Sequence, residues 1–476
     1  MSLLARAPAF AVLCGWIGAL SAVRLGVSPI AAAAAGGLCT AAVLLWGEGA
    51  FPAPGSLPPA VLILLVSFLG SWWVAARLVQ APELPRRLDE TGRVLLERSW
   101  GSSRVALMGF PSGRFLVALP WGTGAMEGQM YRVRGGPRPF RSSDSLRGFD
   151  EEAYWRCRGA QGVLDAALLE FRSPPSGWVA WRNGVRSALL LNLPSPVRGY
   201  LLAAWLGRRD PDLARQHARW GTSHILAVSG FHVALVVGIL HLLLRRVPGR
   251  LLWESLFLWG YVLLAGAAAS ALRAGAMIQV VLLGGALGRP SRAFHSLCVA
   301  ALLLLALNPW LFTDLGFRLS VLSVLVLSSW SGLPRPFLPL AGPLVWLVTA
   351  PLVTWAFGTV PVAGLAVNLL ALPFFALFFP LVSLLSLPAL AGLPGSALLA
   401  FPGELMAEAF ALVADGICRI LPWQVPFSPL LASLAAGAAA FGALRASSCS
   451  VPRAILAALG LAGGVLAWSV RVLAGV

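Results

Sequence analysis

SHILAVSGFHVALVVG, residues 223–238, places polar side chains inside an apolar run that is long enough to cross a lipid bilayer. Its notable members are His224, Ser229, Gly230 and His232. Ionisable groups at membrane depth are costly and usually face a protein interior or a water-filled cavity. The segment therefore indicates a buried polar lining in a membrane-embedded domain.

The composition of the whole chain is typical of an α-helical polytopic membrane protein. Of its 476 residues, 58% are hydrophobic and 12% are charged, which is more apolar material than one soluble domain can cover. Apolar runs of about 20 residues recur between Pro, Gly and Arg, and this is the length of a membrane-spanning helix. The first run is soon followed by another, so we expect a retained helix, not a cleaved signal peptide.

The charge and the cysteines narrow the possible partners. All 36 basic residues are arginines and the formal net charge is +17, which suggests anionic lipid or nucleic acid. A G- and C-rich genome explains the arginines by codon choice; the functional alternative is that Arg keeps its charge when desolvated and binds phosphate through a fork. The six cysteines lack CxxC spacing, so we expect core residues and no metal or other cofactor.

The first 175 residues predict two domains. Apolar runs at 8–23, 29–46 and 57–79 predict three spanning helices in a domain of residues 1–79. From residue 80 to 175, charged residues become dense and short apolar alternations predict a small β domain, with strands at 92–100, 103–110, 113–121 and 128–136. Four or five short strands in about 90 residues suit a compact barrel such as an OB-fold, a shape often used to bind single-stranded nucleic acid.

This β domain carries a candidate nucleic-acid interface. The arginines expected to follow a phosphate backbone are Arg132, Arg134, Arg138, Arg141 and Arg147. The aromatic residues expected to stack on bases are Tyr131, Phe140 and Trp155. The alternative is a solvated basic surface with ordinary core aromatics.

The rest of the chain predicts more helices. Residues 176–221 predict amphipathic helices at the membrane interface, anchored by Trp178 and Trp181, and residues 222–476 predict a polytopic domain. NLLALPFFALFFPLVSLLSLPALAG at 368–392 is expected to be kinked or discontinuous. The positive-inside rule puts the N-terminus in the cytoplasm and residues 80–221 outside.

Three passages resemble the ComEC competence family, polytopic channel proteins that pass single-stranded DNA across the inner membrane during natural transformation. They are HILAVSGFHVAL at 224–235, SALRAGAM at 270–277 with LNPWLFTDLGFRLSVLSVL at 307–325, and TAPLVTWAFGTVPVAGLAVNLLALPFF at 349–375. The β domain, which ends in FDEEAYWRCRGAQGVL at 149–164, is similar to the family's extracytoplasmic OB-like domain. The resemblance implies that residues 222–476 form the competence channel domain.

The chain departs from this family at two points. Many members carry a C-terminal domain like a metallo-β-lactamase with an HxHxDH run, but here no histidine follows His295. We therefore expect no nuclease activity and no other enzyme activity, with a separate nuclease and an energising ATPase or DNA receptor as partners. The family usually has an uncharged amide where this chain has Arg318.

Residues 223–238, which we call the organising segment, are compatible with more than one chemistry. On a helix, Ser229 and His232 would share one face, but no Asp or Glu lies near in sequence to orient a base, so hydrolysis is not expected. A metal ion shared by His224 and His232 would need a helix break at Gly230, because eight helical residues rise about 12 Å. Hydrogen-bonded histidines in a solid bundle and a polar lining for a conduit are equally compatible with the sequence.

Further polar residues in the apolar domain have two interpretations each. Arg273 either offers a positive charge to passing phosphates or snorkels from a helix end. Asp314 and Arg318 have the spacing of a helical ion pair and are expected to neutralise each other. Asn368 either satisfies freed carbonyls or lines the path. An interfacial helix face is expected at Glu404, Glu408 and Asp415.

The sequence thus predicts a multi-pass inner-membrane channel for single-stranded DNA, shaped by His224, Ser229, His232 and Arg273 and surrounded by membrane lipids. The first alternative is a transporter or intramembrane hydrolase for another anionic substrate, such as a lipid or polymer precursor. The second is an inactive structural paralogue.

Overall fold

The computed structural model describes residues 8–48, 57–80, 82–100, 103–120, 124–140, 150–228, 230–288, 293–330, 341–393, 395–446 and 451–474. The chain divides into two compact units. The helical unit comprises Met1–Val79, Ser195–Leu384 and Phe401–Val476, and the barrel unit comprises Gln80–Pro194 and Leu385–Ala400.

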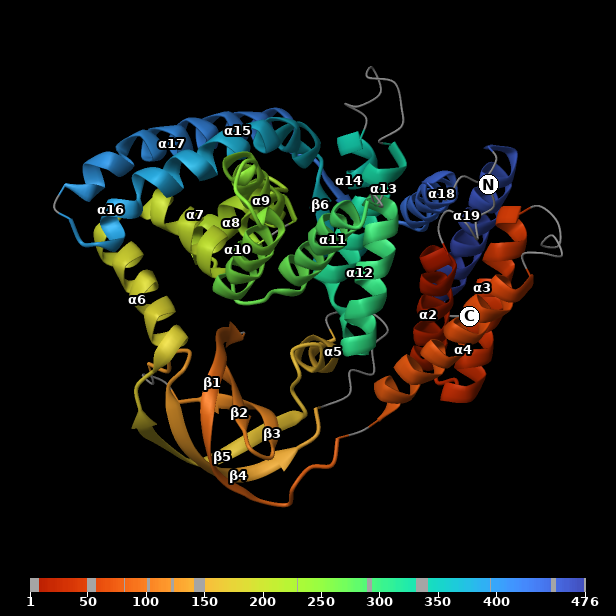
Figure 1. The fold of residues 1–476 in the computed structure, drawn as a ribbon, viewed down its shortest axis with the longest axis horizontal. Coiled ribbons are helices and arrows are strands. Elements are labelled where there is room, and N and C mark those ends of the chain that lie inside the picture. The colour runs from red at the N-terminus through yellow and green to blue at the C-terminus, as the bar shows by residue number, and fades with distance from the viewer. Residues whose placement is uncertain are drawn as a thin grey trace. The chain divides into compact units, whose positions relative to one another are not determined.

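Five strands of the barrel unit close into a barrel in the order β1-β2-β3-β5-β4 (Figure 1). They are β1 (Leu88–Trp100), β2 (Ser103–Phe110), β3 (Gly113–Leu119), β4 (Met130–Arg138) and β5 (Gly162–Ser173). The β3–β5 pair is parallel and the other pairs are antiparallel. Alternate side chains such as Met108, Phe115 and Val133 fill the barrel core.

The four strands expected from Gly punctuation and alternation are confirmed as β1 to β4. β2 has the predicted bounds because glycine and serine residues interrupt the apolar alternation at both ends. The small β domain is therefore correct, and β5 is a strand that the sequence did not locate.

The described residues of the barrel unit also form the helices α5 (Glu151–Arg156), α6 (Gly177–Asn192) and α16 (Leu387–Leu390). Trp155 of α5 is fully buried in a cluster with Leu107 and Leu116 of the barrel. Asn183 of α6 donates its side-chain amide to the Glu127 carbonyl oxygen at 2.8 Å. These contacts attach α5 and the first part of α6 to the barrel.

The helical unit holds the remaining elements, and α17 begins in the barrel unit. The helices before the β6 strand are α2 (Pro8–Arg24), α3 (Pro29–Glu48), α4 (Leu57–Val79), α7 (Ser195–Leu206), α8 (Pro211–Arg219), η2 (Ser223–Leu226), α9 (Gly230–Leu244), α10 (Arg250–Leu264), α11 (Ala269–Ala286), α12 (Ala293–Leu307), η3 (Pro309–Thr313), α13 (Leu315–Trp330) and α14 (Ala341–Phe357). The elements that follow are β6 (Thr359–Pro361), α15 (Ala363–Leu385), α17 (Ser396–Ile420), β7 (Gln424–Pro426), α18 (Pro429–Ala446) and α19 (Val451–Ala474).

Small residues bring the first three helices together. The hydroxyl groups of Thr40 and Ser67 are 2.6 Å apart, and a Cβ added to Gly36 would lie 2.7 Å from the Gly15 carbonyl oxygen. Such close backbone approach is common between membrane helices, where packing replaces the hydrophobic effect. Arg77 of α4 also donates to the carbonyl oxygens of Ala306 and Leu307, at 3.3 Å each, and so joins α4 to the C-terminal end of α12.

Among the described residues, three helices are long and apolar enough to cross a membrane: Pro59–Val79, Ala363–Leu385 and Ser396–Ile420. The first two apolar runs of the chain are shorter apolar helices. The helix Ser396–Ile420 contains Glu404, Glu408 and Asp415, for which an amphipathic helix at the membrane interface was expected. It is instead long and apolar enough to cross a membrane.

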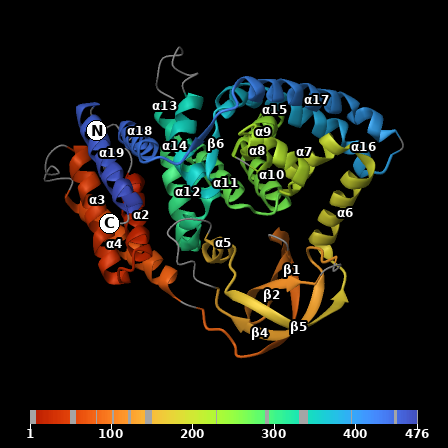
Figure 2. The ribbon, with the colours of Figure 1, turned by 180° about the vertical axis from the view of Figure 1, so that it is seen from behind.

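The proline-rich run from residue 368 is less interrupted than its sequence suggests. Helix α15 continues through Pro373 and Pro380 and ends at Leu385, and a turn at Ser386 separates it from α16. Helices α15 and α17 lie side by side in both views (Figures 1 and 2), where Phe374 and Phe410 stack at 4.7 Å between ring centroids. The expected discontinuity therefore occurs only at the end of the run.

Helix α7 differs from the surface helix expected within residues 176–221. Eight of its residues are buried, among them Tyr200 and Leu201, because the helix is apolar from Tyr200 to its end at Leu206 and packs inside the helical unit. An amphipathic helix at an interface would leave one face exposed.

Candidate functional site

The organising segment is broken before Gly230. His224 lies on the 3₁₀ helix η2, and His232 lies in the first turn of α9. Ser229 is outside the described residues, so the expected Ser229–His232 face stays a prediction. The break removes the spacing of about 12 Å that a continuous helix would impose on the two histidines.

The two histidines have different surroundings. His224 is exposed although many protein atoms surround it, whereas His232 is only 3% exposed. The His232 ring meets the Phe379 ring of α15 edge-on, with 4.5 Å between centroids. His232 is therefore a packed side chain, and His224 is the more exposed of the two.

Arg273 near the start of α11 is the most unusual charge in the helical unit. It is 2% exposed, so it does not snorkel. Its guanidinium donates to the Ser320 hydroxyl of α13 and, at 3.1 Å, to the Met277 sulfur. Among the described residues it has no ion-pair partner, and its Nε is buried without a hydrogen bond.

Helices α9, α11 and α13 meet around Arg273. A Cβ added to Gly230 would lie 3.5 Å from the Arg273 Nη2, so the start of α9 faces the guanidinium. The Ser270 hydroxyl donates to the Val228 carbonyl oxygen at 2.5 Å, which fixes the chain just before α9 against α11. The structure thus brings Gly230 and Arg273 together.

Asn368 lies on a second contact of the same segment. Its side-chain amide donates to the Gly221 carbonyl oxygen at 3.3 Å, and its Oδ1 is buried without a partner among the described residues. Asn368 therefore contacts the turn before the organising segment, and both of its expected roles stay predictions.

Asp314 and Arg318 act at the junction of η3 and α13. Asp314 accepts a hydrogen bond from the Phe317 backbone N–H at 2.9 Å, which caps the start of α13. The Nε of Arg318 donates to the Phe312 carbonyl oxygen at 2.6 Å, and its guanidinium lies 4.9 Å from the Phe312 ring centroid. Their mutual neutralisation stays a prediction.

A buried polar cluster next to the organising segment was missed from the sequence. His217 of α8 is fully buried, and its Nε2 and Nδ1 each lie 2.8 Å from a hydroxyl oxygen, that of Tyr200 and that of Thr222 respectively. Trp220 donates its indole N–H to Asp415 of α17 at 2.8 Å. The sequence signal is Trp220, which follows His217 by three residues at the end of an otherwise hydrophilic helix.

The burial of His217 predicts acid sensitivity. Desolvation lowers the pKa of His217 to about 3, below the value of about 6.5 in the unfolded chain. The unfolded state therefore binds the extra proton first, and the contribution of His217 to stability is present above pH 6.5 and lost as the pH falls toward 3. Thermal unfolding of the detergent-solubilised chain should show a smaller loss of stability from pH 7 to pH 4 for His217→Gln than for wild type. Equal pH slopes for the two chains would contradict this assignment.

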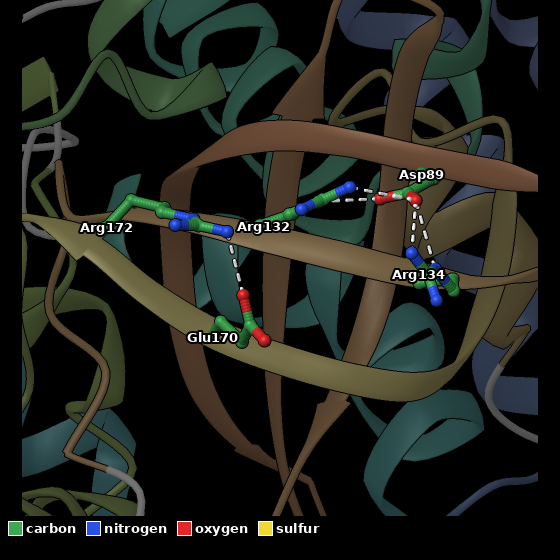
Figure 3. A network of polar contacts seen from close by, with 5 residues as sticks. All are labelled: Asp89, Arg132, Arg134, Glu170 and Arg172. Atoms are coloured by element: carbon green, nitrogen blue, oxygen red, sulfur yellow. Dashed lines mark hydrogen bonds and ion pairs between the residues drawn. The ribbon is translucent and has the colours of Figure 1, made fainter.

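The barrel arginines lie on the outer face of β4 and are ion-paired. Arg132 and Arg134 both contact Asp89 of β1 at 2.8 Å, and Arg138 contacts Asp165 at 2.6 Å. Figure 3 shows the guanidinium groups of Arg132 and Arg134 converging on the Asp89 carboxylate. Arg141 and Arg147 lie outside the described residues.

The aromatic residues expected to stack on bases are core residues. Tyr131, Phe140 and Trp155 are 6%, 8% and 0% exposed, because the barrel and α5 bury them. The structure does not support a stacking role for these three rings. Where the structure describes side chains, the exposed aromatic residues of this unit are instead Phe171 at the end of β5 and the stacked pair Trp178 and Trp181 of α6.

Comparison with known proteins gives the family. A family model described as "Competence protein" matches residues 206–466. "ComE operon protein 3" of Bacillus subtilis (strain 168) is 30% identical over 199 residues, which cover 38% of this chain and 25% of that relative. The chain thus matches about a quarter of the length of this curated relative. No solved structure matches the chain. Because the family model covers more than half of the sequence, the chain belongs to the competence protein family.

Proposed function

We propose that this protein is a multi-pass inner-membrane channel that passes single-stranded DNA into the cytoplasm during natural transformation. Membership of the competence family supports a role in DNA uptake. The barrel unit receives a strand through its arginines, and the helical unit conducts it past His224 and Arg273. Ser229 and His232 shape the same path.

Arg273 is the observation that carries the proposal. A charged side chain that is 98% removed from solvent in an apolar helical unit is costly, and it has no carboxylate partner among the described residues. Such a charge is retained where it meets an anion, and a guanidinium matches phosphate oxygens well. Gly230, at the break in the organising segment, faces this charge, and exposed His224 lies on the turn before the break.

The architecture supports the finer parts of the proposal. Nine shorter apolar helices accompany the three that reach membrane-spanning length among the described residues, which favours a polytopic helical unit. The barrel order β1-β2-β3-β5-β4, with its parallel β3–β5 pair, favours an OB-like barrel. Barrels of this kind bind single strands by combining a positive groove with aromatic stacking.

The remaining steps of uptake belong to partners. The channel itself performs no hydrolysis; a separate nuclease degrades the second strand, and an energising ATPase or DNA receptor delivers and drives the first. The membrane lipids form its surroundings.

Loss of the chain tests the proposal directly. Deleting the gene in a competent host should abolish entry of labelled DNA into the cytoplasm, and expression of the wild-type chain from a plasmid should restore it. Binding of DNA at the cell surface is the control, because it should survive the deletion. DNA entry that continues without the chain would overturn the channel.

Proteoliposomes distinguish this function from transport of another anionic molecule. The purified chain should raise the uptake of a labelled single-stranded oligonucleotide but not of an anionic lipid or polymer precursor. The reverse selectivity would favour the transporter, because Arg273 offers its charge to any phosphate.

A further inference from the structure

The outer face of the barrel contains a carboxylate that two arginines share. Asp89 Oδ1 accepts from the Arg132 Nε at 2.8 Å, and its Oδ2 accepts from the Arg132 Nη2 at 3.2 Å. The same Oδ2 accepts from the Arg134 Nε at 3.0 Å. Figure 3 shows this convergence, and one carboxylate thus receives two guanidinium forks.

The register of the barrel explains why these side chains meet. Asp89 is directly opposite Arg134 in the β1–β4 ladder, and Arg132 is two residues along the same strand. Alternate residues of a strand share a face, so both arginines point outward while Val133 between them is fully buried. The pair is therefore held in place by the sheet before any ligand arrives.

The face keeps an excess of positive charge. Arg172 pairs with Glu170 at 2.8 Å on β5, and Glu170 is opposite Arg132 in the β4–β5 ladder. The five side chains in Figure 3 thus include three arginines and two carboxylates. Hydrogen bonds from Arg132 and Arg134 hold the pKa of Asp89 below its usual value, so its carboxylate is ionised at neutral pH.

Two guanidinium groups converging on one pair of oxygens is the geometry with which arginines bind a phosphate. We propose that Asp89 is an internal mimic of a backbone phosphate: it occupies the Arg132–Arg134 clamp until single-stranded DNA displaces it. This inference rests on the proposed DNA-binding role of the barrel.

While Asp89 occupies the clamp it masks the two arginines, and this mask would make the barrel select a strand over a single phosphate. Asp89 is tethered beside the clamp, so its effective concentration is high, on the order of millimolar or more. A single free phosphate competes poorly against it, whereas a strand that contacts several arginines at once gains enough to displace it. The ion pairs are about two-fifths exposed or more on the arginine side, and pairs of this kind are weak enough to exchange.

Binding of the full-length chain in detergent to a fluorescent single-stranded oligonucleotide tests the mask. Asp89→Asn should tighten binding about fivefold, because the two exposed ion pairs of Asp89, worth about 1 kcal/mol together, no longer compete with the strand. The slope of log affinity against log salt should stay the same, because the bound strand contacts the same two arginines in both chains. Asp89→Glu keeps the charge and should stay close to wild type.

Glu90→Gln is the matched control. This variant removes the negative charge of Glu90, the residue next to Asp89. The Glu90 carboxylate accepts from the Ser112 hydroxyl at 2.9 Å and from the Ser112 N–H at 3.2 Å. A general effect of net charge would act on both variants, but release of the clamp would act on Asp89→Asn alone.

A double-mutant cycle completes the test. Arg132→Gln with Arg134→Gln should weaken binding, and adding Asp89→Asn to that chain should change nothing further. If Asp89→Asn tightens binding equally in both backgrounds, or no more than Glu90→Gln does, the mask is wrong although the barrel binds DNA. If wild type and all variants fail to bind the oligonucleotide, the DNA-binding role of the barrel fails, and the mask fails with it.

Discussion

Replacing Arg273 with methionine is expected to lower DNA uptake roughly tenfold to a hundredfold, the effect of losing one charge-assisted hydrogen bond of about 1.5–3 kcal/mol. The folded helical unit should at the same time keep its stability or gain about 1 kcal/mol, because a buried charge is replaced by an apolar side chain of similar length. Within the described part of the chain, the bonds lost are those to Ser320 and Met277. A serine hydroxyl in a helix can bond to a carbonyl of its own preceding turn, so Ser320 is not left unsatisfied.

Opposite directions for uptake and stability are the signature of a functional charge. Uptake is measured in a deletion host that expresses each variant, and stability by thermal unfolding in detergent. Arg273→Lys keeps the charge without the planar fork and should retain part of the uptake. Met277→Leu removes the sulfur contact alone and should transport normally. A chain with Arg273→Met that unfolds more easily and loses uptake in proportion would make Arg273 a packing residue.

The regular elements were predictable where a local pattern determines them. The β2 strand alternates between short polar boundaries, so the sequence contains its bounds. The break at Gly230 was also visible as a possibility, because a glycine follows a serine inside an apolar run. Local chemistry is sufficient for such features.

The positions of the aromatic and charged side chains of the barrel required the tertiary structure. Tyr131 and Arg132 are neighbours in sequence, yet the ring is in the core and the guanidinium is outside. Asp89 is 43 residues from Arg132, and only the β1–β4 register makes them partners. A basic stretch therefore predicts a surface, but not how much of its charge is already neutralised.

His217 shows the same limit in the helical unit. Its surroundings, RRDPDLARQHARWG at 208–221, are hydrophilic and typical of an exposed helix, and α8 has the charge pattern of one. The residue is buried because α7 supplies Tyr200 and because α15 supplies Phe375, whose ring centroid lies 6.1 Å from that of His217. Tyr200 comes from the preceding helix and Phe375 from a distant part of the chain, so no local pattern identifies them.

Gly221 is the position in this region where we expect the largest loss of stability from one added methyl group. Its φ is +71°, a conformation that costs an L-residue roughly 1–2 kcal/mol. A Cβ there would lie 2.9 Å from the Cα of Gly364 and 3.0 Å from Pro361. Because the Gly364 contact is backbone, α15 would have to move, and overpacking of this kind costs about 1–3 kcal/mol more. Gly221→Ala should therefore destabilise the helical unit by about 2–5 kcal/mol.

Gly249→Ala separates the two contributions. Gly249 has φ of +70° and nothing within 4 Å of an added Cβ, so it has the backbone strain without the contact. Thermal unfolding in detergent should show Gly221→Ala clearly less stable than Gly249→Ala, and the difference measures the packing of α15 against the turn. The Gly221 carbonyl also accepts from Asn368, so a displaced α15 would leave that amide without its partner and alter the chain that leads to His224. Equal stabilities of the two variants would mean that α15 does not pack against this turn, and Asn368 would then lose its assigned partner.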